Sequence, residues 1–200
     1  MSAEWSVQSL QSSLAKKDLY PLYYFFGDET FLIDEALVQL QEVALADGLR
    51  DFNLNTYYGD HVDASVIRDA IETLPMMAQV RLVVVKEAHD LSEKDWENLL
   101  PVLESPVEST IFVCIGNRID RRKKYIKKFI ERGVVVEFKR PFENQIPDWI
   151  VSISKRYGLK LDTEVVALVH QLVGSNLVDI NGELLKISQY IGTRKAVTTD

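Results

Sequence analysis

The sequence predicts an α/β fold in which helices cover a parallel sheet, followed by a small helical lid domain. Residues 82–85 and 111–115 are continuous apolar runs, which are typical of strands buried on both faces. Amphipathic helical segments separate the expected strands, as right-handed crossovers in a parallel sheet require. From Pro141 onward the sequence shows helical patterns and no strand pattern. We therefore expect an α/β domain over residues 1–140 and a three-helix lid domain over residues 141–192.

The first expected strand and helix meet at a glycine. Residues 22–26 form a short aromatic run that Gly27 closes, as at the end of a strand. A helix over residues 30–46 is expected next, because apolar side chains recur there at helical spacing. Asp28 is the expected N-cap of this helix, and Gly48 is its expected end.

Strands and helices continue to alternate through the first domain. Alternating side chains predict a strand over residues 52–57, and Asp63 is the expected cap of the next helix. Ser92, with Asp95 in an approximate capping box, is expected to start a helix that Pro101 stops. The remaining elements are expected to be strands over residues 81–86, 110–115 and 134–138 and a basic helix over residues 118–132.

Three helices are predicted for the second domain. Gly158 and Gly174 are their expected stops, and Pro147 suits a first helical position. Residues 193–200 are expected to form an exposed tail. The helices are expected over residues 147–157, 162–173 and 176–191.

Composition restricts the class of protein. Hydrophobic residues make up 46% of the 200 residues, so a packed core is expected. No apolar run approaches the roughly 20 residues needed to span a bilayer, and the N-terminus lacks the features of a signal peptide. The single cysteine, Cys114, lies inside an apolar strand pattern, which suits a buried, reduced thiol. We therefore expect a cytoplasmic protein with no membrane partner.

The segment around Gly27 has the layout of a phosphate-binding loop and the wrong residues for one. Such a loop needs further glycines, a lysine for the phosphates and a hydroxyl for magnesium. This chain has Leu32, Ile33 and Asp34 where the second glycine, the lysine and the hydroxyl residue belong, and its acidic turn would repel a triphosphate. The sequence therefore predicts a fold of the nucleotide-binding type that binds no nucleotide or other cofactor.

An α/β domain followed by a helical lid is the layout of the AAA+ ATPases, which supports a second test. In those enzymes an acidic residue at the end of a buried strand holds magnesium. The equivalent strand ends here in Lys86, a cation that would repel the metal, and Glu87 is interpreted as a surface carboxylate. Asn117 resembles a polar sensor position, although ordinary turn chemistry explains it equally well. The three histidines are far apart in sequence and predict no metal site.

Two segments are candidates for binding a partner. Leu74, Met76 and Met77 surround Pro75 between a helix and a strand, where they either pack into the core or form an exposed apolar tip that anchors a partner. Residues 118–132 contain eight basic and two acidic residues in a chain whose net charge is −7. They form either a solvated cationic face or a contact surface for DNA phosphates or an acidic partner. The candidate contacts are Arg121, Lys123, Lys124, Lys127 and Lys128.

Three stretches together resemble a known family. Residues 22–36 combine an aromatic strand, a Gly-Asp-Glu turn and a Phe-Leu-Ile run followed by an acidic pair. Residues 73–85 place Leu-Pro-Met-Met before the Leu-Val-Val-Val strand, and residues 174–187 contain Gly-Ser-Asn-Leu and Glu-Leu-Leu-Lys-Ile. On these residues the chain resembles the delta subunit of the bacterial DNA polymerase III clamp loader, over nearly its whole length.

The resemblance implies a non-catalytic subunit of a DNA-directed DNA polymerase holoenzyme. Delta subunits bind and open the sliding clamp for loading onto primed DNA, and they do not bind ATP themselves. The matching clamp-binding tip is Leu74, Met76 and Met77, with Met77 in a place where the family usually has Phe. The family also has a third, collar domain, which is absent from these 200 residues. The implied partners are the sliding clamp (beta), the gamma/tau and delta prime subunits, which bind through the collar, and primer-template DNA.

Two other functions remain open at this point. One is a cryptic nucleotide-binding AAA+ ATPase with an unusual loop. The other is a DNA-binding module that uses the basic helix over residues 118–132.

Overall fold

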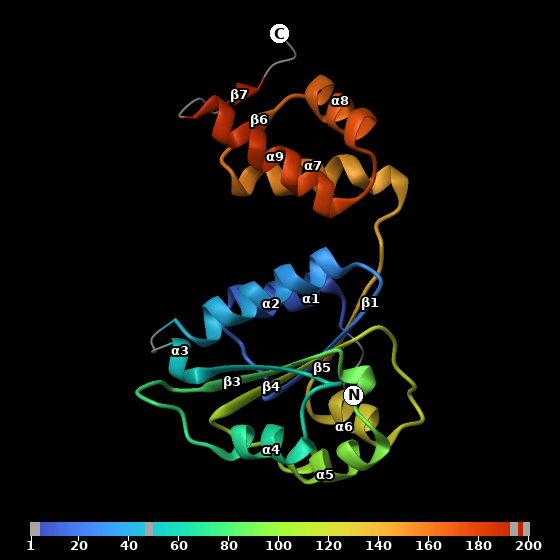
Figure 1. Ribbon diagram of the computed structural model, residues 1–200. Helices are drawn as coiled ribbons and strands as arrows, with labels where there is room; N and C mark the ends of the chain where they lie inside the picture. The colour runs from blue at the N-terminus through green and yellow to red at the C-terminus, as the bar shows by residue number, and fades with distance from the viewer. Residues whose placement is uncertain (1–4, 47–49, 193–195, 198–200) are drawn as a thin grey trace. The chain divides into compact units, whose positions relative to one another are not determined.

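The computed structural model describes residues 5–46, 50–192 and 196–197. Contacts between residues divide the chain into two compact units, Met1–Lys139 and Arg140–Asp200. Figure 1 shows the first unit as a sheet between helices and the second as a group of helices.

A five-stranded parallel sheet is the centre of the first unit, as the sequence predicts. The strand order is β2-β3-β4-β1-β5, so the chain crosses over the sheet between successive strands. Strand β1 lies between β4 and β5 and pairs with both. The strands are β1 (Leu22–Gly27), β2 (Leu54–Tyr58), β3 (Arg81–Lys86), β4 (Thr110–Gly116) and β5 (Val134–Phe138).

Helices cover both faces of this sheet, which is why residues 82–85 of β3 and 111–115 of β4 are apolar. Figure 1 shows α1 and α2 on one face and α4, α5 and α6 on the other. Trp96 of α5 stacks on Tyr125 of α6 with ring centroids 3.9 Å apart, and the buried Phe129 packs against the edge of Trp96. The helical elements are α1 (Val7–Ala15), α2 (Thr30–Ala44), α3 (Arg50–Asn53), α4 (Ala64–Glu72), the 3₁₀ turn η1 (Ala88–Asp90), α5 (Glu93–Glu104) and α6 (Lys124–Arg132).

The start of α2 and the start of β2 differ from the sequence prediction. Glu29, not Asp28, is the N-cap residue of α2, and its side chain caps none of the described N–H groups of the helix. The expected stop at Gly48 lies outside the described residues. Phe52 belongs to the single turn α3, because pairing with β3 begins only at Leu54, opposite Leu82.

Two other boundaries are set by forces that local sequence patterns do not show. Helix α5 continues through Pro101 to Glu104, because burial of Val102 and Leu103 offsets the hydrogen bond that proline cannot donate. The basic helix begins at Lys124 rather than at residue 118. Before it, the Asp120 carboxylate accepts the Arg122 N–H at 3.0 Å and closes a turn that competes with helix formation.

Over its described residues the second unit has the three expected α-helices, and the structure adds a short pair of strands. Gly158 and Gly174 have φ of +69° and +86°, so they end α7 and α8 as expected. The strands β6 (Lys160–Leu161) and β7 (Ala196–Val197) pair in parallel, so residues 196–197 of the expected tail are in a strand; the rest of the expected tail, residues 193–195 and 198–200, lies outside the described residues. Two-residue strands are too short to produce a pattern. The helical elements are the 3₁₀ turn η2 (Glu143–Gln145), α7 (Ile146–Arg156), α8 (Thr163–Val173) and α9 (Leu177–Ile191).

Gly27 is required by packing at the end of β1. Its φ is +132°, and a Cβ atom there would lie 2.1 Å from the carbonyl oxygen of Phe138 in β5. We predict that Gly27→Ala lowers the free energy of unfolding by about 2–4 kcal/mol, since both the backbone and the β1–β5 contact would be strained. Urea titration followed by circular dichroism measures this change.

Gly182→Ala in α9 is the matched control for this substitution. A Cβ atom at Gly182 would meet no atom within 4 Å, so alanine is expected to stabilise the helix by roughly 0.5–1 kcal/mol. Equal effects of the two substitutions would contradict the proposed contact between Gly27 and Phe138.

Candidate functional site

The turn after β1 uses its backbone N–H groups to hold the sheet together. The N–H of Gly27 donates to the carbonyl oxygen of Asn117 at 3.1 Å, and the N–H of Glu29 donates to that of Phe138 at 3.2 Å. A phosphate-binding loop needs such N–H groups free to point at its ligand. Two backbone donors of this turn are therefore committed to the residue after β4 and to β5, and are not free for a phosphate.

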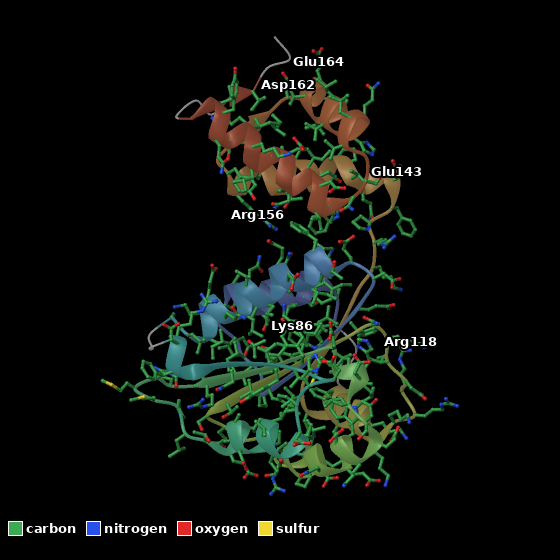
Figure 2. The ribbon with its side chains drawn as sticks, in the orientation of Figure 1. Lys86, Arg118, Glu143, Arg156, Asp162 and Glu164 are labelled. Carbon is green, nitrogen blue, oxygen red and sulfur yellow. The ribbon has the colours of Figure 1, made fainter. Side chains whose placement is uncertain are left out.

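Lys86, the last residue of β3, is a second feature that does not suit nucleotide binding. Its Nζ lies 3.4 Å from Oδ1 of Asp34 in α2, so the residue in the expected place of the metal ligand is a cation paired with a carboxylate. Lys86 is labelled in Figure 2. The pocket that these residues line with Gly27 has a volume of about 190 Å³. Pockets for ligands of drug size usually measure roughly 300–1,000 Å³. A second pocket at this edge, lined by Asp28, His89 and Asn117, measures about 560 Å³, so the charge of Lys86 rather than size argues against a magnesium–nucleotide complex here.

The remaining polar groups at this edge take part in ordinary turn contacts. Nδ2 of Asn117 lies 3.1 Å from Nε2 of His89, and Glu87 is exposed, with a φ of +55° before η1. His170, in the second unit, pairs instead with Glu143 at 3.0 Å. Among the described residues, no three His, Cys, Asp or Glu side chains are grouped to hold a metal ion.

An exposed apolar tip lies at the opposite edge of the sheet. Leu74, Met76 and Met77 expose 75%, 49% and 80% of their surface in the loop between α4 and β3. This loop precedes β3, so the tip lies at the amino edge of the parallel sheet, whereas Gly27 and Lys86 lie at the carboxyl edge. The alternative that these side chains pack into the core does not hold for this loop.

The backbone of the tip is held by two polar side chains that sequence reasoning missed. Asn53, which is fully buried, accepts the Met76 N–H at 2.6 Å and donates to the Met76 carbonyl oxygen at 2.8 Å. Arg81, at the start of β3, donates from Nη2 to the carbonyl oxygen of Leu74 at 3.4 Å and from Nη1 to Asn55 at 2.6 Å. The contacts to the tip cross between separate elements, so no local sequence pattern indicates them.

The basic segment is partly neutralised by the chain's own carboxylates. Lys123 pairs with Glu93, while Nζ of Lys128 lies 3.2 Å from Glu131 and 3.8 Å from Glu104. Lys124 and Lys127 are exposed on α6 and form no ion pair with the described residues. They are therefore the lysines of α6 most available to a partner, and Arg132 at the end of the helix is exposed as well.

The turn before α6 has its own ion pair. Arg122 donates both a backbone and a guanidinium hydrogen bond to Asp120, which lowers the pKa of that carboxyl to about 2. Arg118, labelled in Figure 2, is exposed on the loop that follows β4. Arg121, on the same loop, takes part in an interaction with another residue. This stretch of the predicted basic helix is thus a charged loop, held in part by an internal ion pair.

The match to a family model decides the family. The model for the DNA polymerase III delta subunit matches residues 23–139, more than half of the chain. The chain belongs to the DNA polymerase III delta subunit family. This confirms the resemblance that the sequence indicates.

The relatives of this delta-family chain agree in sequence and in fold. It is 30% identical over 200 residues to DNA polymerase III subunit delta of Bacillus subtilis, covering 94% of the chain and 57% of that relative. The solved DNA clamp loader delta protein (YqeN) of the same organism superposes with a TM-score of 0.75 at 27% identity, over 96% of this chain and 60% of that one. This delta-family chain therefore spans a little over half the length of these relatives.

More distant structures show the fold alone. A DNA polymerase III gamma subunit-related protein of Thermotoga maritima superposes with a TM-score of 0.51 at 13% identity, covering 92% of this chain and 73% of that one. The expected AAA+-like fold is confirmed. In the part of the chain that the structure describes, no helix has the length and apolarity needed to cross a membrane.

The carboxyl edge of the sheet provides a test of nucleotide binding. We expect calorimetry with ATP and magnesium to detect no binding, because the Gly27 and Glu29 N–H groups are already bonded and Lys86 repels the metal. Lys86→Asp is expected not to create binding, since it leaves those N–H groups engaged. Tight, magnesium-dependent binding by the unmodified chain would instead establish the cryptic ATPase.

Proposed function

We propose that this delta-family chain binds the sliding clamp through Leu74, Met76 and Met77 and favours the open form of the clamp for loading onto primed DNA. The observation that carries the proposal is the exposure of three large apolar side chains on a loop with a fixed backbone. Exposed apolar clusters of this kind mark partner sites in soluble proteins. Membership of the DNA polymerase III delta subunit family supports a sliding clamp as the partner.

The energetics suit a small anchor. Burial of one Leu or Met side chain contributes roughly 1.5–3 kcal/mol, so three such side chains can offset much of the entropy lost on association. Methionine adapts its unbranched thioether to the shape of an apolar pocket. The tip favours opening if it binds the open form of the clamp more tightly than the closed form. A ligand shifts a conformational equilibrium only by its difference in affinity for the two forms.

The proposed role is non-catalytic. The edge of the sheet at which AAA+ enzymes hold nucleotide has here a closed turn and a Lys86–Asp34 pair. ATP would accordingly be bound by other subunits of the assembled loader. We place the gamma/tau and delta prime subunits and primer-template DNA among the partners of the whole protein, and its site of action in the cytoplasm.

A pair of substitutions tests the tip. Met76→Ala with Met77→Ala is expected to weaken binding to the sliding clamp at least about 30-fold, as loss of two anchor side chains at the centre of an interface does. Isothermal titration of the chain against the clamp measures the affinity.

Leu168→Ala with Leu172→Ala is the matched control for the tip. It removes similar exposed apolar surface from α8 in the second unit, and its affinity for the clamp is expected to equal that of the parent chain. Equal affinities of the parent chain and the Met76/Met77 variant would exclude the tip as the clamp-binding site.

The two unpaired lysines of α6 favour a second contact surface, for DNA phosphates. Lys124→Glu with Lys127→Glu is expected to weaken binding to a primer-template duplex and to lower the slope of log affinity against log salt by about 2. Lys155→Glu with Lys160→Glu, on exposed positions of the second unit, is the control of equal charge change. Equal losses in the two variants would indicate a general charge effect and would remove α6 from the proposal.

A further inference from the structure

We propose that Asn53 is the positioning residue of the clamp-binding tip, so that affinity for the clamp depends on a side chain that does not itself touch it. This inference rests on the proposed function of Leu74, Met76 and Met77. It concerns the shape of the loop, whereas the proposed function concerns the side chains that the loop presents.

The carboxamide of Asn53 substitutes for a strand partner. It offers an acceptor and a donor in one plane, and these bond the N–H and the carbonyl oxygen of the same residue, Met76, at 2.6 and 2.8 Å. Asn53 is fully buried, so water does not compete for these bonds. The arrangement fixes the peptide groups on both sides of Met76.

A second side chain bonds to the loop backbone on the other side of Pro75, at Leu74. Nη2 of the buried Arg81 donates to the Leu74 carbonyl oxygen at 3.4 Å, and Nη1 donates to Asn55 at 2.6 Å. Asn53 and Asn55 flank Leu54, the first residue of β2. The loop is thus anchored at three backbone atoms to the beginnings of β2 and β3, while its apolar side chains remain exposed.

The backbone at Met77 shows what this anchoring achieves. Its φ is +51°, in the left-handed region that a methionine seldom adopts. A loop without the Asn53 bonds would leave this conformation for part of the time. If the clamp binds only the anchored conformation, its apparent affinity is the intrinsic affinity multiplied by the fraction of loops in that conformation, so losing the Asn53 bonds weakens binding.

Other side chains at position 53 cannot reproduce both bonds. Aspartate keeps the acceptor for the Met76 N–H, loses the donor and places its charge against the Met76 carbonyl oxygen. Alanine loses both groups. The donor and the acceptor can therefore be separated experimentally.

The first measurement is the affinity of Asn53→Ala for the sliding clamp, corrected for the folded fraction of the chain. We expect roughly tenfold weaker binding, because two hydrogen bonds that select one loop conformation are lost. Val136→Ala, at a fully buried position of β5, is the control for stability. It is expected to lower the unfolding midpoint and to leave the corrected affinity unchanged.

The second measurement separates positioning from a general structural role. In the background of Met76→Ala with Met77→Ala, the further change Asn53→Ala is expected to have no additional effect on clamp affinity, because the side chains that it positions are gone. Hydrogen exchange at the Met76 amide is expected to be slow in the parent chain and fast in Asn53→Ala. If Asn53→Ala does not fold, Asn53→Asp is measured in its place, with weaker binding expected.

The outcomes distinguish the two proposals. Weaker clamp binding by both the Asn53 and the tip variants, with no additive effect, supports positioning. Parent-like affinity of Asn53→Ala beside weak binding by the tip variant overturns positioning and leaves the proposed function intact. Parent-like affinity of the tip variant overturns both.

Discussion

The first unit depends on the close approach of Gly27 to the carbonyl group of Phe138. Strand β1 lies between β4 and β5, and the turn that follows it is bonded to the ends of both through the N–H groups of Gly27 and Glu29. Only a residue without a side chain permits this approach, as the 2.1 Å distance from a Cβ atom to the oxygen shows. The turn that fixes the start of α2 therefore uses two of its backbone donors, the N–H groups of Gly27 and Glu29, within the fold.

The parallel sheet separates this closed turn from the proposed working surface. All strands begin at one edge and end at the other, so residues before β2 and β3 gather at the amino edge. Asn53 meets Met76 of the loop there, 23 positions away in sequence, and the Lys86–Asp34 pair lies at the carboxyl edge. A fold whose usual ligand edge is closed by internal bonds can still use the other edge, since the sheet holds both rigidly.

Sequence reasoning succeeds where burial leaves a periodic or continuous pattern and fails where distant contacts decide. The apolar runs of β3 and β4 predict buried parallel strands because covered faces exclude polar side chains. The extension of α5 past Pro101 depends on what Val102 and Leu103 meet in the folded chain, which the local sequence does not record. The tip residues are found from the sequence, but their exposure is not, because methionine suits a core and a surface anchor equally well. Asn53 is missed altogether, since its partner belongs to another element.

Because the tip is held through main-chain atoms, its geometry and its chemistry are separable. Asn53 and Arg81 bond to the backbone of Leu74 and Met76, and none of these bonds involves a tip side chain. Side chains of the tip can therefore be exchanged over evolutionary time without reshaping the loop that carries them. A tip with other apolar side chains therefore requires no redesign of the fold beneath it.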